Sequence, residues 1–226
     1  MNKNKTLSGR SFLQYDNPKK LFFMLHGYGD TAENFIHIAS SIDNIDFRAN
    51  YFALDAPSEI PNYSLGRQWF DLNPNGIYIT DAGPKEIKII ESEILLANQL
   101  LQNTISEEIA KYNLSFKDCF LLGFSQGGMM TFEFGNYTTN LLGGLAILSG
   151  RIMTEDIITN QSLLKTPIFI SHGDCDDVLP IKTFDKACKF LKKSNMLYES
   201  FKLKGDTHMI SSNAINLLQK FIKKNL

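Results

Sequence analysis

The chain alternates between short apolar runs and longer segments in which apolar residues recur every three or four positions. Five runs are nearly continuous in hydrophobic residues and end at glycine, proline or serine: LFFMLHG (21–27), YFALDAP (51–57), CFLLGFS (119–125), GGLAILSG (143–150) and TPIFISHG (166–173). Apolar runs that do not alternate with polar residues and are bounded by turn residues predict strands buried on both faces of a parallel sheet.

Helical periodicity is clearest between the second and third runs. A helix is predicted to start at Pro84, because a proline ring suits the first helical turn. Its predicted apolar stripe consists of Ile87, Ile90, Ile94, Ala97, Leu101, Ile105 and Ile109. A last helix is predicted after a cap at Ser211 or Ser212, with lysines near its carboxyl end. Because strands and helices alternate, we predict an α/β fold with a mostly parallel, doubly wound sheet flanked by helices.

Chain length and composition predict one α/β domain over residues 1–226. A chain of 226 residues with 43% hydrophobic residues can bury a substantial core. Residues 151–165 between two predicted strands are too few for a cap domain. The segment LSGRSFLQY (7–15) is a candidate antiparallel edge strand, although its glycine weakens that assignment.

Charge and hydropathy exclude several classes of protein. The net charge of −1 and the absence of a basic stripe argue against nucleic-acid binding. No apolar run approaches the roughly 18 residues of a membrane span, so no integral membrane segment is predicted. The N-terminal lysines precede no apolar segment, and Cys119, Cys175 and Cys188 have no paired spacing. We therefore expect a cytoplasmic protein without a structural metal. No surface stripe argues for a homodimer, which stays an open alternative.

Candidate chemistry lies at the predicted strand ends, where the loops of a doubly wound sheet bind ligands. Residues 123–127, GFSQG, match the pattern G-x-S-x-G, which exposes a serine nucleophile at a tight strand-to-helix turn. A serine hydroxyl needs a base, and His208 follows the predicted final strand. Ser125, an aspartate and His208 occur in the order found in α/β-hydrolases. The alternatives are a helix-capping serine and a surface histidine.

The loop SHGDCDDVLP (171–180) offers three aspartates for the acid. Asp174 lies in a tight turn directly after the predicted strand, where a carboxylate commonly bonds its own backbone. Asp176 and Asp177 both stay candidates. A metal site made of His172, Asp174, Cys175 and Asp176 would mix hard and soft ligands, and no second ligand cluster is evident.

A negative oxygen that develops on an attacked carbonyl needs two amide donors. The first candidate is the amide of Gln126, directly after the serine. The second is the amide of Tyr28 in LHGYGD (25–30), where two glycines free the backbone to turn it inward. A phosphate cradle is not predicted, because neither G-x-G-x-x-G nor a P-loop lysine is present there.

Six spaced motifs resemble the phospholipase/carboxylesterase family of α/β-hydrolases, which includes bacterial carboxylesterases and acyl-protein thioesterases. They are LHGYGD, RQWFD, GFSQGG, LSG, HGDCDDVLP and GDTHMI, in the family's order from residue 21 to the carboxyl terminus. The resemblance implies that the acid is Asp176, which occupies the last position of H-G-x-x-D. It further implies Ser125 as nucleophile and His208 as base, with the oxyanion amides at Tyr28 and Gln126 and no cofactor.

The resemblance also bears on the substrate. Trp69 of RQWFD corresponds to a segment that borders the family's acyl pocket, so it is a candidate wall of that pocket, the alternative being a core tryptophan. Residues 58–83 form the longest predicted irregular stretch and are expected to make a low apolar rim. Arg151-Ile152-Met153 replaces the aromatic-leucine-proline turn of the thioesterase branch. The leading hypothesis is a serine hydrolase of small to medium carboxylic esters or thioesters. The alternatives are a thioesterase or lysophospholipase for long acyl chains, and a non-catalytic hydrolase-fold binding protein.

Overall fold

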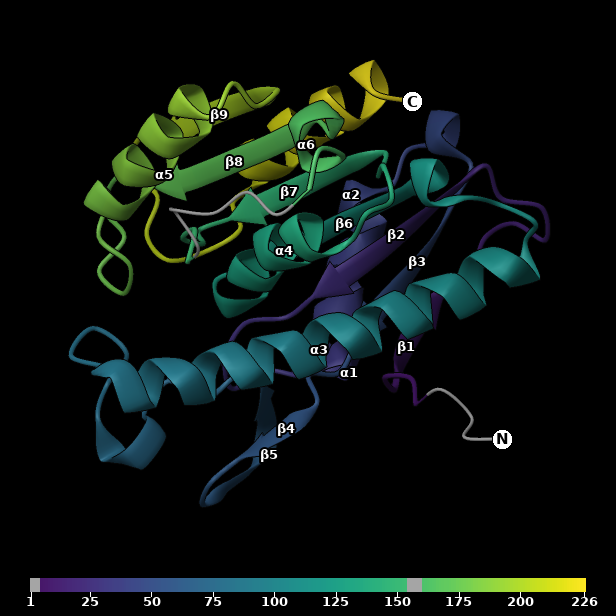
Figure 1. Cartoon of the computed structure of the whole chain (residues 1–226). Coiled ribbons are helices and arrows are strands. Elements are labelled where there is room, and N and C mark those ends of the chain that lie inside the picture. Colours follow the sequence, from purple (N-terminus) through teal and green to yellow (C-terminus); the bar gives the residue numbers. More distant parts are fainter. Residues whose placement is uncertain (1–4, 154–159) are drawn as a thin grey trace.

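A seven-stranded sheet forms the centre of the computed structural model, which describes residues 5–153 and 160–226 (Figure 1). Its strands are β1 (Gly9–Phe12), β2 (Lys20–Leu25), β3 (Ala49–Leu54), β6 (Cys119–Phe124), β7 (Gly144–Leu148), β8 (Ile168–Gly173) and β9 (Tyr198–Leu203). Their order is β1-β3-β2-β6-β7-β8-β9. Strand β1 pairs antiparallel with β3, and the other neighbours are parallel. The predicted α/β fold is confirmed.

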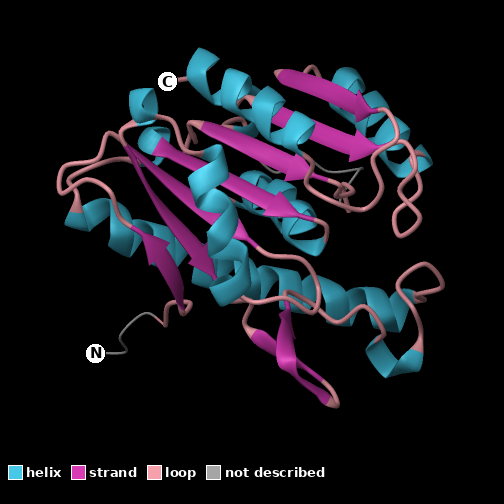
Figure 2. Cartoon of the chain, turned by 180° about the vertical axis from the view of Figure 1, so that it is seen from behind, coloured by secondary structure: helices cyan, strands magenta, loops and turns pink. Residues whose placement is uncertain are grey.

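Helices cover both faces of the sheet. Helices α3 (Pro84–Lys111), α4 (Gln126–Tyr137) and α5 (Lys182–Lys193) lie on the face seen in Figure 1. Helices α1 (Ala32–Phe35), α2 (Ala39–Ile42) and α6 (Ser212–Lys224) lie on the opposite face, seen in Figure 2. Successive residues of β2 contribute to different hydrophobic clusters, with Phe23 on the first face and Phe22 on the second. This is why the apolar run is continuous.

The glycine in the edge strand has a steric reason. A Cβ on Gly9 would lie 2.1 Å from the carbonyl oxygen of Ala53, which is in the neighbouring strand β3. A side chain at this position would push the two strands apart, so the pairing requires glycine here. This holds although glycine has a low intrinsic preference for strands. The predicted antiparallel edge strand is confirmed.

Residues 58–83 are less irregular than the sequence suggests. Strands β4 (Ser58–Ile60) and β5 (Tyr63–Gln68) form a separate antiparallel hairpin, with Asn62 in the left-handed conformation at its turn. A 3₁₀ turn follows at Pro74–Gly76. A Cβ on Gly66 would lie 2.2 Å from the carbonyl oxygen of Gly29, so this hairpin packs backbone against backbone on the loop after β2. That contact joins residues far apart in the sequence, and no local pattern reveals it.

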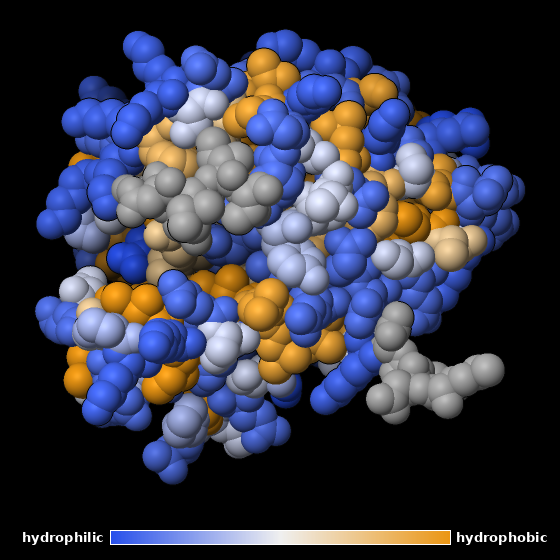
Figure 3. Space-filling view, in the orientation of Figure 1, coloured by the Kyte–Doolittle hydropathy of each residue, from blue (hydrophilic) through white to orange (hydrophobic). Residues whose placement is uncertain are grey.

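The apolar stripe of α3 is confirmed except at its first position. Ile87 is 45% exposed, whereas Glu86 is buried and accepts hydrogen bonds from the Gly83 amide and from Asn75. The exposed apolar residues Leu95 and Leu96 also lie on α3, and Figure 3 shows apolar patches along this helix. The first turn of α3 therefore packs on the 3₁₀ turn rather than on the sheet.

The remaining 3₁₀ turns are short: Ile36–Ile38, Ile45–Phe47, Phe116–Asp118 and Leu163–Lys165. Among the described residues, Leu163–Lys165 is the regular element between β7 and β8. This is the connection for which the sequence predicts no cap domain. Within residues 5–153 and 160–226, no helix has the length and apolar character required to cross a membrane.

Candidate active site

The turn between β6 and α4 holds Ser125 in a conformation that L-residues rarely adopt, with φ 54° and ψ −116°. A Cβ on Gly123 would lie 2.1 Å from the carbonyl oxygen of Gly127, and a Cβ on Gly127 would lie 2.0 Å from that of Leu25. Both glycines are thus required by close backbone approach. They allow α4 to start directly against the end of β2 and leave the Ser125 side chain at the edge of the sheet.

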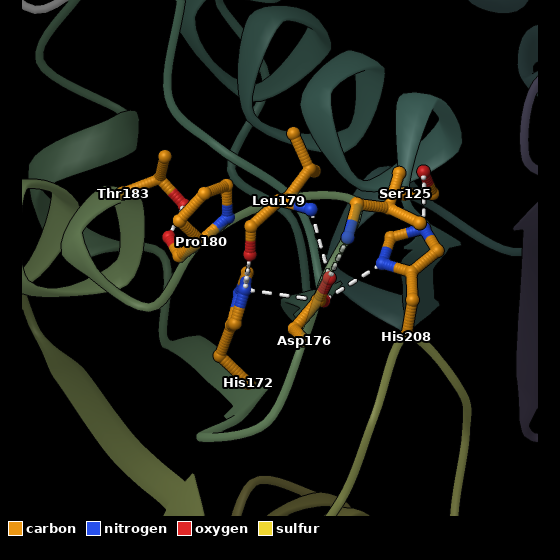
Figure 4. A network of polar contacts seen from close by, with 8 residues as sticks. Ser125, His172, Asp176, Leu179, Pro180, Thr183 and His208 are labelled. Atoms are coloured by element: carbon orange, nitrogen blue, oxygen red, sulfur yellow. Dashed lines mark hydrogen bonds and ion pairs between the residues drawn. The ribbon is translucent and has the colours of Figure 1, made fainter.

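A chain of hydrogen bonds joins the three predicted side chains (Figure 4). Nε2 of His208 lies 2.9 Å from Oγ of Ser125, and Nδ1 of His208 lies 2.7 Å from Oδ2 of Asp176. The imidazole therefore donates from Nδ1 to the carboxylate and accepts at Nε2 from the serine hydroxyl. Such a chain can move the serine proton onto the imidazole while the carboxylate stabilises the resulting cation.

The structure separates the candidate aspartates. The side chain of Asp176 is fully buried, and its Oδ1 accepts the amide hydrogens of Val178 and Leu179 at 3.0 and 2.8 Å. Asp177 is exposed, and Oδ1 of Asp174 accepts the amide hydrogen of Gly205 at 2.7 Å. Asp176 is therefore the one of the three that contacts His208.

A second histidine, His172, also contacts Asp176, although the sequence patterns did not place it in the hydrogen-bonded series Ser125–His208–Asp176. Nε2 of His172 lies 3.2 Å from Oδ2 of Asp176 and 2.7 Å from the carbonyl oxygen of Leu179. The His172 side chain is fully buried. It joins the acid to the loop that follows it, as Figure 4 shows. The signal available in the sequence was its position four residues before Asp176, at the end of β8.

Two backbone amides beside Ser125 have no protein partner among the described residues: those of Tyr28 and Gln126. A Cβ on Gly27 would lie 3.5 Å from Cβ of Ser125, so the loop after β2 passes directly beside the serine. Tyr28 and Gln126 both line the cavity that contains Ser125. Unpaired amides at such a position can stabilise a negative oxygen on an attacked carbonyl.

The cavity around Ser125 has a volume of about 610 Å³ and mostly apolar walls. Its apolar lining comes from Leu72, Tyr78, Ile79, Phe124, Met129, Val178, Leu179 and Pro180. Part of the predicted rim is thus present, since residues 72–80 contribute to the wall. Two cationic residues, Arg151 and Lys182, line the same cavity.

Trp69 does not line this cavity, and of the two roles considered for it, a wall of the acyl pocket or a core tryptophan, its position matches the core residue. Its side chain is wholly buried, and its indole Nε1 donates to the carbonyl oxygen of His26 at 2.9 Å. Its amide donates to Oε1 of Gln126 at 2.9 Å. Both polar groups of Trp69 therefore bond to protein, one to the residue after β2 and one to the residue after Ser125. These contacts place Trp69 beneath the loops of the site.

His26 is buried at the end of β2 and fully hydrogen-bonded. Nδ1 lies 2.7 Å from the carbonyl oxygen of Gly27, and Nε2 accepts the amide hydrogen of Ala56 at 3.1 Å. Burial lowers the pKa of His26 below its ordinary value, although the Gly27 carbonyl and the nearby Asp30 and Asp55 act in the opposite direction. The neutral imidazole is therefore favoured.

The described residues contain no group of three or more histidine, cysteine, aspartate or glutamate side chains arranged to hold a metal ion. His172 and Asp176 of the conceivable metal set contact each other, whereas Asp174 and Cys175 are exposed.

A mostly parallel α/β sheet with a strained serine at a strand-to-helix turn, a histidine and a buried acid defines an α/β-hydrolase type of protein. The chain belongs to the phospholipase/carboxylesterase family, whose model matches residues 14–226. It is 28% identical to a probable carboxylesterase SOBER1-like protein of Arabidopsis thaliana, with 100% of this chain and 87% of the relative covered. It is also 28% identical to acyl-protein thioesterase 1 of Saccharomyces cerevisiae, with 92% and 93% covered.

Among solved structures, esterase PE8 superimposes with a TM-score of 0.83. The two chains are 24% identical, and the match covers 98% of this chain and 100% of the other. At this identity the likeness concerns the fold.

The lowered pKa of His26 predicts a pH-dependent contribution to stability. A group whose pKa is lower in the folded than in the unfolded state favours folding when it is deprotonated. The contribution of His26 is complete above the unfolded-chain pKa of 6.5 and is lost as pH falls through the lower folded value. We expect His26→Asn to reduce the fall in melting temperature between about pH 7.5 and pH 5. An equal fall in melting temperature for wild type and His26→Asn, measured by calorimetry, would contradict this prediction.

Proposed function

We propose that the protein is a serine hydrolase that cleaves carboxylic esters of small to medium acyl chains through an acyl-enzyme on Ser125. The observation that carries the proposal is the hydrogen-bonded chain from Ser125 through His208 to the buried Asp176, with distances of 2.9 and 2.7 Å. Membership of the phospholipase/carboxylesterase family supports it, as do the carboxylesterase and thioesterase relatives.

The reaction proceeds in two halves. Oγ of Ser125 attacks the acyl carbonyl while Nε2 of His208 takes the hydroxyl proton, and His208 then gives this proton to the leaving alcohol or thiol. Asp176 holds the Nδ1–H tautomer and stabilises the imidazolium. A water molecule, deprotonated by His208, attacks the acyl-enzyme, and the carboxylic acid leaves as the Ser125 proton is restored. No cofactor takes part.

The amides of Tyr28 and Gln126 act as the oxyanion hole in both halves. Their availability supports this role, since neither has a protein acceptor within the described residues. Pre-oriented donors are already in place when charge develops on the oxygen, and the loss of one donor typically costs roughly 10²–10³ in kcat.

The cavity supports the choice of acyl chain. Its apolar walls suit a short hydrocarbon chain, but Arg151 and Lys182 also line it. Placing many methylene groups against charged side chains would strip water from those charges at a cost in free energy. A small ester or thioester is therefore the proposed substrate.

We extend the proposal to location. The three cysteines are free in the structure, which supports a reducing compartment such as the cytoplasm. A homodimer and a single domain over residues 1–226 stay predictions.

A fluorophosphonate probe tests the nucleophile. We expect intact mass spectrometry to find one adduct on the wild-type protein and none on Ser125→Ala, because the hydroxyl that attacks phosphorus is removed. Turnover of a nitrophenyl ester should fall roughly 10⁶-fold in this variant. A wild-type protein without an adduct would overturn the proposal in favour of a non-catalytic binding protein, and an adduct that persists in Ser125→Ala would place the nucleophile elsewhere.

The neighbouring aspartates provide a matched pair of variants. Asp176→Asn removes the charge that faces His208 and permits the wrong imidazole tautomer, so kcat should fall roughly 10⁴-fold. Asp177→Asn changes an exposed side chain one position away and should leave kcat within about twofold of wild type. Comparable losses in the two variants, measured by steady-state kinetics, would exclude Asp176 as the specific acid.

Acyl preference separates the proposal from its alternative, a thioesterase or lysophospholipase for long acyl chains. We expect kcat/KM on nitrophenyl esters to be highest for butyrate or hexanoate and to fall for laurate and palmitate. A palmitoyl thioester serves as the parallel substrate. If palmitoyl substrates give the highest kcat/KM, the long-chain alternative replaces the proposed specificity while the serine chemistry stands.

A further inference from the structure

The buried histidine at the end of β2 has contacts that define its protonation. Nδ1 of His26 faces a carbonyl oxygen, that of Gly27, and must carry the hydrogen, whereas Nε2 faces the amide hydrogen of Ala56 and must be the acceptor. Only the neutral Nδ1–H tautomer makes both hydrogen bonds. The residue is 0% exposed, so bulk solvent does not reach either ring nitrogen.

The Gly27 carbonyl belongs to the same peptide unit as the Tyr28 amide. A peptide unit is planar, and in the trans form its C=O and N–H point in opposite directions. The described residues contain no cis peptide bond. A hydrogen bond that holds the Gly27 oxygen toward the His26 ring therefore turns the Tyr28 N–H away from that ring. The Asp30 amide donates a second hydrogen bond to the same oxygen, at 3.3 Å.

Gly27 and Tyr28 line the cavity that contains Ser125, and the Tyr28 amide has no protein acceptor among the described residues. If the Gly27–Tyr28 peptide flipped, it would present a carbonyl oxygen where a donor is needed. Glycine at position 27 makes such a flip easy, because it has no Cβ to restrict its dihedral angles. The hydrogen bond from His26 opposes it.

A buried network links this peptide to the second candidate donor. The carbonyl oxygen of His26 accepts from the Trp69 indole, and the amide of Trp69 donates to the side chain of Gln126. That side chain in turn donates to the Phe70 carbonyl oxygen at 2.7 Å. Gln126 also lines the cavity beside Ser125, and its backbone amide has no protein acceptor among the described residues. Both amides are therefore supported by the same set of buried hydrogen bonds.

We propose that His26 is a positioning residue of the oxyanion hole, which holds the Gly27–Tyr28 peptide so that the Tyr28 amide faces the carbonyl attacked by Ser125. This role rests on the proposed hydrolase function. Trp69 extends it by fixing the backbone of His26, which gives the tryptophan of RQWFD a task other than contact with the acyl chain.

The charged groups around His26 are compatible with a neutral ring. Asp30 and Asp55 favour the imidazolium, whereas Arg67 and burial oppose it. The Arg67 guanidinium donates to the carbonyl oxygens of Ala56 and Pro57 and so holds the segment whose amide donates to His26.

Two substitutions at position 26 each remove one of the two hydrogen bonds of the imidazole. In His26→Asn the amide nitrogen occupies the place of Nδ1 and can still donate to the Gly27 oxygen, but the contact with Ala56 is lost. In His26→Gln the side-chain oxygen can reach the Ala56 amide, but the donor to Gly27 is lost. His37→Gln, at an exposed position of the 3₁₀ turn Ile36–Ile38, serves as the matched control.

We expect His26→Gln to lower kcat on a nitrophenyl ester about a hundredfold with KM changed less than about threefold, because a misplaced donor weakens the transition state rather than substrate binding. His26→Asn should recover at least about tenfold of that loss, and His37→Gln should match wild type. If His26→Gln retains wild-type kcat, or if His26→Asn is as impaired as His26→Gln, His26 does not position this peptide.

A measurement on the wild-type protein decides the geometry without activity. Long-range ¹H–¹⁵N spectra of protein labelled in its histidines should show His26 as the Nδ1–H tautomer with a slowly exchanging imidazole hydrogen. An Nε2–H tautomer or an imidazolium at neutral pH would overturn the inference, even where a variant fails to fold. Absence of turnover together with absence of a fluorophosphonate adduct would instead overturn the proposed function.

Discussion

The backbone approach between the turn at Ser125 and the end of β2 is the constraint on which the site depends. Gly127 lies so close to the Leu25 carbonyl that any side chain would collide with it, and Gly123 is equally close to the Gly127 carbonyl. This packing brings the start of α4 onto the sheet and keeps Ser125 at a positive φ. It also brings the loop after β2 beside the serine, so one contact places Ser125 close to the residues Tyr28 and Gln126 that line the same cavity.

The buried charge at the site is stabilised by the surrounding loop. Asp176 accepts two backbone amides and faces two imidazoles, so a carboxylate removed from water keeps nearly all of its hydrogen bonds. Asp177 has no such surroundings and points to solvent. The difference between the two adjacent aspartates is therefore one of local backbone geometry rather than of residue type.

Three histidines lie near the cavity in two kinds of environment. His208 is partly exposed beside the serine, whereas His26 and His172 are buried and bond to backbone carbonyls. Both ring nitrogens of His26 have backbone partners, which makes its ring a rigid donor and acceptor, whereas Nε2 of His172 contacts the Leu179 carbonyl oxygen and Asp176. The two buried imidazoles therefore contact backbone and the buried acid, and the partly exposed His208 is the one that contacts Ser125.

Sequence patterns determined much of this protein. Continuous apolar runs identified five of the parallel strands, and G-x-S-x-G with a downstream acid and histidine selected Ser125 and His208, because buried strands and tight strand-to-helix turns leave local signatures. The residue patterns alone left Asp176 and Asp177 open and missed the β4–β5 hairpin, and the family resemblance left Trp69 as either an acyl-pocket wall or a core residue. Those features depend on contacts between distant segments: His208 with Asp176, Gly66 with Gly29, and Trp69 with His26. Only the tertiary structure decided them, since hydrogen bonds and backbone packing across loops have no periodicity in the chain.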